Sequence, residues 1–186
     1  MIGFFKRLLA RRDAIANDVV RLIEEEQDKY CAMSAEELLA LSDDELLAVV
    51  WMRTERVVAG FDSERRALDN MNDAQKNFYI IQYYVLQVND GGLCQYFANA
   101  GRDTAFFLSD ALTAVGAEEH RALFEAFLHD NKVATAALLS FAVDNSRDFK
   151  KMEKSYPFEE FNTSFYALAP LTESVAAYVR ENIGAF

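Results

Sequence analysis

The stretch NDGGLCQYFANAG, residues 89–101, decides how the middle of this chain folds. It holds three of the seven glycines and follows an uncharged run, residues 77–89. Gly91 and Gly92 can take backbone angles that a side chain would forbid, so one helix should break there and a short second helix should begin. Gly101 suits a left-handed cap that ends this second helix. The stretch therefore predicts a structured elbow between helices.

Before the elbow, apolar residues recur at helical spacing. Residues 4–30 predict one or two amphipathic helices. Residues 34–37 and 42–45 both match the capping-box signature, and the second box should open a helix that ends near Gly60. The acidic residues in these boxes satisfy free backbone amides, so part of the acidic character has a structural explanation.

The helix that leads into the elbow is predicted to be central and buried. Asp73 can cap it, and residues 78–88 are apolar nearly all round, with Gln82 and Gln87 as the exceptions. The same residues would also suit a strand, but the length of the segment and its cap favour a helix.

After the elbow, three more helices are predicted at residues 104–115, 117–130 and 132–144. Their connections are short, which favours antiparallel neighbours. Ser146 should cap a further helix, and Pro170 should lie in the first turn of the last one.

These patterns predict the all-α fold class. A chain of 186 residues, 52% of them apolar, suits one domain with a sizeable core. We predict a single helical domain over residues 1–186, a multi-helix bundle of about eight to ten helices. Its parts would be an amphipathic N-terminal segment, residues 1–30, and a helical core, residues 73–186.

The cysteines and the uncharged stretches indicate a compartment. Cys31 and Cys94 lie among apolar residues, which predicts free thiols rather than a disulfide. The start of the chain lacks the pattern of a secretory signal, and the longest uncharged stretches fall short of the ~20 residues that a membrane span needs. We therefore expect a cytoplasmic protein with no stable membrane insertion.

The charge is strongly negative and unevenly distributed. The net charge is -11, although residues 1–12 carry four basic groups and no acidic one. Such a surface repels nucleic acid and attracts basic partners, so we expect a basic protein partner and no direct binding of nucleic acid. Solubility alone is the simpler explanation of the charge. The carboxylates that could meet a basic partner are Glu24, Glu25, Glu26, Asp28, Glu36, Glu37, Asp43, Asp44 and Glu45.

The basic N-terminal segment has two further interpretations. Its apolar face could lie on an anionic membrane. Docking onto the rest of the domain, or onto a second copy in a homodimer, is the simpler prediction.

No residue set in the sequence spells out a reaction. His120 and His129 should point to opposite faces of one helix, and no paired ligand motif accompanies them, so no metal site or cofactor is predicted. Cys94 lies near a helix start, but its apolar neighbours favour burial over catalysis. Gly91 and Gly92 lack the companions of a phosphate loop. We therefore predict no catalytic residue.

The elbow leaves two possibilities open. Its residues could be architectural, above all Gly91, Gly92, Tyr96, Phe97 and Asn99. Alternatively, a small-molecule or enzymatic pocket could form there from Asn89, Asp90, Gln95, Tyr96 and Asn99. A closed pocket with unpaired polar groups would favour the second possibility, and a filled elbow would reject it.

Several segments resemble a bacterial family of helical domains typified by the neisserial DNA-mimic protein. They are VNDGGLCQYFAN at residues 88–99, AVGA at 114–117, FEEFN at 158–162 and YVRENI at 178–183, and the first is the specific one. The resemblance implies an all-helical domain, often dimeric. In one branch of the family, acidic side chains imitate phosphates and occupy a DNA-binding protein. The predicted function is thus a non-enzymatic acidic interaction domain with a basic partner, such as a DNA-binding protein.

Overall fold

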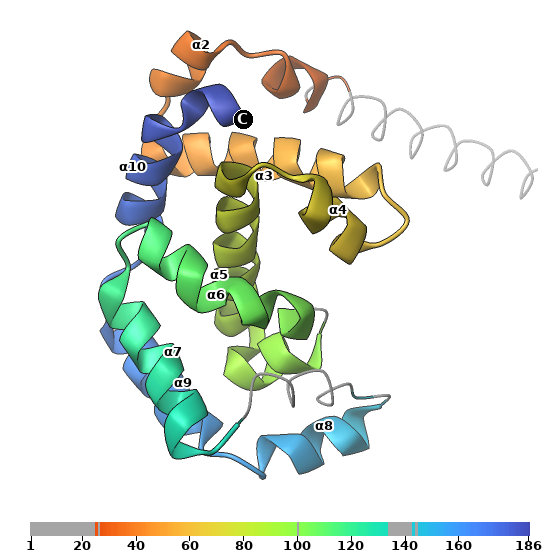
Figure 1. Cartoon of the computed structure of the whole chain (residues 1–186), viewed down its shortest axis with the longest axis vertical. Helices are drawn as coiled ribbons and strands as arrows, with labels where there is room; N and C mark the ends of the chain where they lie inside the picture. Colours follow the sequence, from red (N-terminus) through yellow and green to blue (C-terminus); the bar gives the residue numbers. More distant parts are fainter. Residues whose placement is uncertain (1–24, 26, 100, 134–142, 144) are drawn as a thin grey trace, which may run out of the picture. The chain divides into compact units, whose positions relative to one another are not determined.

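The computed structural model describes residues 25, 27–99, 101–133, 143 and 145–186 (Figure 1). Every regular element among them is helical, which confirms the all-α prediction. Most of the predicted helical sequence at residues 4–30 and 132–144 lies outside the described residues. The chain divides into two compact units, Met1–Ala40 and Leu41–Phe186, and each is described by itself. A single domain over the whole chain stays a prediction.

In the first unit, α2 spans Ala35–Leu39 and begins with the predicted capping box. The backbone amide of Glu37 donates to Ser34 Oγ at 3.2 Å, and the backbone amide of Ser34 donates to the Glu37 carboxylate at 2.7 Å. The hydrogen bonds from the Ser34 backbone and hydroxyl lower the pKa of Glu37. This carboxylate therefore helps to start a helix.

Residues 25 and 27–31 of the first unit are also helical, and the second unit contains the other helices of the described chain. They are α3 (Asp43–Ala59), α4 (Glu64–Asn70), α5 (Asp73–Ala98), α6 (Gly101–Ala114), α7 (Glu118–Asp130), α8 (Ser146–Glu153), α9 (Phe158–Ala167), α10 (Thr172–Glu181) and the short 3₁₀ helix η2 (Ile183–Ala185). The capping box predicted for α3 is present, with Ser42 as its N-cap, and Gly60 ends the helix as expected.

Four predicted caps or boundaries were wrong by one or a few residues. Asn72 caps α5 instead of Asp73, and Asn145 caps α8 instead of Ser146, because in each case the amide side chain reaches the free backbone amides. Pro170 precedes the N-cap residue of α10, so it lies outside the first turn. Gly101 is the first residue of α6, and the short helix before it ends at Ala98.

Helix α5 is the centre of the second unit, as predicted. It packs against α6 and α9, and also against α3, α8 and α10 (Figure 1). Phe78, Ile80, Ile81 and Tyr84 have no exposed surface. The prediction of burial nearly all round was wrong at Leu86, which is 52% exposed, because it lies at an open groove beside α5.

An aromatic cluster fills the space around the elbow. Tyr84 from α5 meets Tyr96 edge to face, at 5.2 Å between ring centroids, and meets Phe165 from α9 in the same way at 5.6 Å. Such edge-to-face pairs stabilise beyond their buried area. The rings that complete the cluster are Phe97, Phe124, Phe127, Phe158 and Phe161.

The two central tyrosines should respond oppositely to loss of the hydroxyl group. Tyr84 Oη is buried and has no hydrogen-bond partner among the described residues, whereas Tyr96 Oη lies 2.9 Å from Thr104 Oγ1. We expect Tyr84→Phe to raise the free energy of unfolding by up to about 1 kcal/mol and Tyr96→Phe to lower it by about 1 kcal/mol. Urea unfolding of both variants measures the difference, and equal losses would contradict this account.

Candidate functional site

The elbow is a break inside α5. Gly91 and Gly92 leave helical geometry, and the helix resumes at Leu93. Gly92 has φ of 77° and ψ of -179°, a conformation that is essentially restricted to glycine. The prediction that these two glycines end one helix and begin a short second one is therefore confirmed.

The side chain of Asn162, from α9, closes the elbow. Its Oδ1 accepts the backbone amide of Leu93 at 3.0 Å, which satisfies a free amide at the start of the short helix. A Cβ atom on Gly92 would lie 2.8 Å from Asn162 Cγ, so only glycine leaves room for this amide group. Asn162 belongs to the FEEFN segment, yet its contact with the elbow could not be read from the sequence.

Removing the Asn162 amide should destabilise the elbow. We expect Asn162→Ala to lower the free energy of unfolding by about 1–3 kcal/mol, because the buried Leu93 amide loses its acceptor. Thr163→Ala, at the exposed neighbouring position, is the control and should change it by less than about 0.5 kcal/mol. Urea unfolding measures both, and indistinguishable values would contradict the assigned role.

The remaining polar side chains of the elbow bond to one another, with the exception of Asn89. Gln95 Nε2 donates to Asp90 at 2.5 Å and to Gln87 Oε1 at 3.3 Å, and Asn99 Nδ2 donates to the same Gln87 oxygen at 2.5 Å. Tyr96 and Phe97 are fully buried in the aromatic cluster. The elbow is thus filled by its own side chains, and nothing in its geometry favours the predicted small-molecule or enzymatic pocket.

Cys94 lies in the same buried layer. It is 2% exposed, and burial, with the charge of Glu153 as a smaller cause, raises the pKa of its thiol to about 12. A nucleophilic cysteine needs a low pKa and access to solvent, so Cys94 has the opposite of both properties. The prediction of a buried thiol is confirmed for Cys94, whereas Cys31 is only half-buried.

The two thiols should therefore differ in reactivity. We expect iodoacetamide at neutral pH to modify Cys31 in the native protein and to modify Cys94 at least about tenfold more slowly. In denaturant the two rates should become similar. Peptide mass spectrometry measures both sites in one sample. Rapid modification of Cys94 in the native protein would contradict its burial and would make it a candidate catalytic residue.

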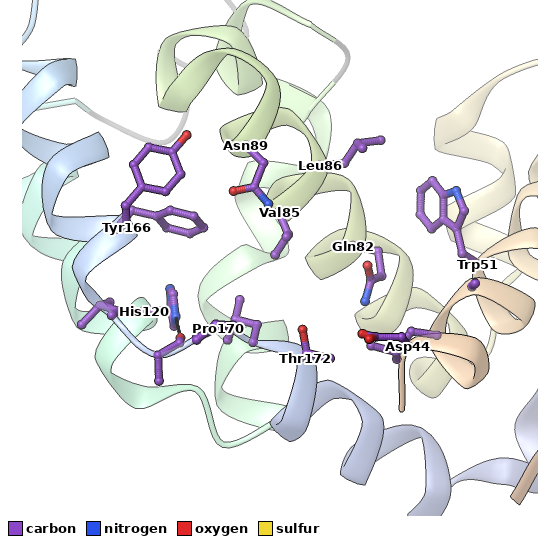
Figure 2. Close-up of a pocket in the computed structure, with 16 residues that line it drawn as sticks. Asp44, Trp51, Gln82, Val85, Leu86, Asn89, His120, Tyr166, Pro170 and Thr172 are labelled. Carbon is purple, nitrogen blue, oxygen red and sulfur yellow. Dashed lines mark hydrogen bonds between the residues drawn. The ribbon is translucent and has the colours of Figure 1, made fainter. Parts of the chain in front are cut away.

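A groove in the second unit brings together Asp44, a predicted partner-binding carboxylate, and Asn89, a predicted residue of the elbow pocket. It has a volume of about 490 Å³, and Asp44 and Asn89 both line it. Figure 2 shows Asp44, Gln82 and Thr172 at one end, and Asn89 and Tyr166 at the other. We call it the α3–α5 groove. Its lining residues are Asp44, Leu47, Ala48, Trp51, Gln82, Val85, Leu86, Asn89, His120, Phe165, Tyr166 and residues 168–172.

Helical spacing explains why these side chains share the groove. Asp44, Leu47, Ala48 and Trp51 lie on one face of α3, and residues 82, 85, 86 and 89 lie on one face of α5. The segment between α9 and α10 forms the third wall. The spacing on α5 was visible in the sequence, but nothing in the sequence showed that α3 faces it.

His120 forms part of the inner wall and was predicted only as an isolated histidine. It is 5% exposed, its ring meets Phe165 edge to face, and its Nε2 lies 2.9 Å from the carbonyl oxygen of Ala169. Nε2 therefore donates to this carbonyl. Nδ1 has no partner among the described residues.

The acidic candidates differ in what they do for the fold. In the second unit, Asp43 accepts from Arg180 at 2.7 Å, and Glu45 completes the capping box, where hydrogen bonds from Ser42 lower its pKa. Asp44 has no partner among the described residues and is exposed. Asp44 is thus the carboxylate of this cluster that is available for binding.

In the first unit, Glu25, Asp28 and Glu36 are exposed, and Glu37 belongs to the capping box. Glu24 and Glu26 lie outside the described residues. Because the two units are described separately, one continuous acidic surface stays a prediction.

Comparison with known proteins places this all-helical chain in a family. It belongs to the DMP19-like protein family, whose model matches residues 69–182, more than half of the chain. This result confirms the resemblance drawn from the elbow and the segments after it. No significant match to a curated protein or to a solved structure was found. Within the described residues, no helix combines the length and the apolar character needed to cross a membrane.

Proposed function

We propose that this chain is a non-enzymatic, acidic interaction domain that binds a basic DNA-binding protein in place of DNA. Membership of the DMP19-like family carries the proposal, because that family suggests a protein of the DNA-mimic type. The net charge of -11 supports it. Carboxylates held on helices can meet the lysines and arginines that otherwise contact DNA phosphates.

The distribution of carboxylates supports the same function. Glu25, Glu36 and Asp44 are exposed and have no partner among the described residues, so they are available to a basic protein. Since Asp43 pairs with Arg180, its replacement would disturb the fold as well as any binding. Charge variants should therefore avoid Asp43.

The first experiment identifies the partner. The purified full chain is immobilised and exposed to nuclease-treated lysate at low salt, and bound proteins are released at high salt. Each captured protein is then purified and bound to a fluorescent DNA duplex. Displacement of the duplex by the full chain, weakening as salt rises, is the expected result. Captured proteins that bind no DNA, or that keep their duplex, would overturn the proposal.

Two charge-matched variants test whether the position of the carboxylates matters. Glu24→Gln, Glu25→Gln and Glu36→Gln together should weaken displacement by at least about tenfold. The control combines Asp110→Asn, Glu119→Gln and Glu159→Gln, which removes equal charge at exposed positions without a partner among the described residues. The control should displace DNA nearly as well as the unchanged chain. Equal weakening would mean that net charge acts alone, and the assigned surface would be rejected.

A further inference from the structure

The α3–α5 groove exposes large apolar side chains that a folded protein normally covers. Leu86 is 52% exposed and Tyr166 is 57% exposed, and both lie on its rim (Figure 2). Leu47, on its floor, is buried. Isolated exposed apolar residues need no explanation, but two that line the same hollow indicate a place where another apolar group binds.

Packing and hydrogen bonds hold the aromatic walls in place. The Trp51 ring stacks on Tyr79 with 5.4 Å between centroids and 9° between planes. Tyr166 Oη donates to the carbonyl oxygen of Val88 at 2.8 Å. Both rings are therefore positioned before anything binds, which lowers the entropic cost of binding.

The polar groups of the groove favour a cation and a peptide backbone. Asp44 is the one charged side chain among the described residues that line it, and it has no partner there. The amides of Gln82 and Asn89 also have no hydrogen-bond partner among those residues, so they can donate to and accept from an added backbone.

We propose that the groove takes a segment of the basic partner in which a leucine-like side chain stands beside a lysine or arginine. The aliphatic group lies against Trp51 and Leu86, and the cation meets Asp44 (Figure 2). This inference rests on the proposed function, because the partner is the same basic protein. A small ligand usually has most of its surface enclosed, whereas the exposed rim suits a side chain carried by a protein.

The groove would supply the specificity that long-range attraction lacks. Unpaired surface carboxylates accelerate the encounter with any basic protein, but they discriminate weakly between such proteins. A rigid aromatic and aliphatic site beside a carboxylate selects partners that present the matching pair of side chains. One wall, on α5, lies inside the family match, whereas Asp44 and Trp51 lie before it. The selecting groups of α3 thus lie outside the region matched to the family.

Trp51 makes the groove directly measurable, since it is the single tryptophan of the chain. Three blocked pentapeptides serve as probes: lysine-leucine-arginine-leucine-lysine, its analogue with serine in place of leucine, and its analogue with glutamate in place of the basic residues. We expect the first peptide to shift Trp51 emission and to bind at least about tenfold more tightly than either analogue.

Single substitutions place the binding in the groove. Leu86→Ser and Asp44→Asn should each weaken the binding of the first peptide by about tenfold. Val57→Ser and Asp110→Asn make the same chemical changes at exposed positions outside the groove lining and should leave binding unchanged. Circular dichroism establishes that all four variants stay folded.

The outcomes separate this inference from the proposed function. Equal binding of the leucine and serine peptides would overturn the proposal that the groove binds a leucine-like side chain. The proposed function would be unaffected if the full chain still displaced DNA. Binding of the glutamate peptide as tight as that of the basic peptide would overturn the cationic occupant. An unchanged Trp51 spectrum with all three peptides at millimolar concentration would overturn the groove as a docking site.

Discussion

Gly92→Ala is expected to lower the free energy of unfolding by roughly 2–4 kcal/mol. At φ of 77° and ψ of -179°, an alanine would be strained whatever space surrounds it. Its Cβ would also press on Asn162, whose side chain accepts the Leu93 amide. Strain and loss of this hydrogen bond therefore act together. Urea unfolding followed by circular dichroism measures the change.

Gly91→Ala is the matched control one residue earlier. Gly91 has φ of -156°, outside the left-handed region, and the atoms nearest to an added Cβ all belong to the side chain of Gln95. Because Gln95 is long and only half-buried, it can move aside, but it then loses its hydrogen bonds to Gln87 and Asp90. We expect a loss of about 1 kcal/mol, smaller than that at Gly92. Losses of equal size at both glycines would contradict the assignment of the strained position to Gly92.

The parts of the fold that were predicted from the sequence depend on local interactions. Each capping box joins residues three apart, so Ser42 and Glu45 specify the start of α3 without help from the rest of the chain. The break at Gly91 and Gly92 was predictable for the same reason. Where a neighbouring residue offers an equally good cap, as Asn72 does beside Asp73, the predicted cap was wrong by one residue.

The parts that could not be predicted depend on long-range contacts. Asn162 meets Leu93 across 69 positions in the chain, and no local pattern indicates such a pair. The exposure of Leu86 follows from which helices cover α5, and that arrangement is a property of the whole unit. The α3–α5 groove was missed for this reason, although Asp44 and Asn89 had both been singled out.

These contacts change which residues are worth testing for function. The elbow was a candidate pocket because it gathers asparagine, glutamine and tyrosine side chains. In the structure Gln95 and Asn99 are bonded to Gln87, and Gln95 is bonded to Asp90, so these groups stabilise the bend in α5. The groove beside it has the reverse character, since Gln82, Asn89 and Asp44 have no partner among the described residues. Polar groups without a protein partner, beside exposed apolar side chains, are better evidence of binding than polar composition alone.

Phe97→Ala is expected to lower the free energy of unfolding by about 3–5 kcal/mol. Phe97 has no exposed surface, and its ring lies 6.2–6.3 Å from those of Phe124, Phe127 and Phe158. Helices α7 and α9 thus both pack against one side chain of the short helix after the elbow. Thermal and urea unfolding measure the loss.

Phe106→Ala is the control for this prediction, because Phe106 is 38% exposed on α6 and should cost less than about 1.5 kcal/mol. If Phe97→Ala lowers the free energy of unfolding much more than Phe106→Ala does, the residues after Gly92 form part of the core of the unit. The bend at the elbow then serves to place Phe97 in the aromatic cluster. A small loss for Phe97→Ala would mean that the cluster tolerates an empty volume beside the elbow. The hypothesis of a ligand pocket at residues 89–99 would then regain its physical basis.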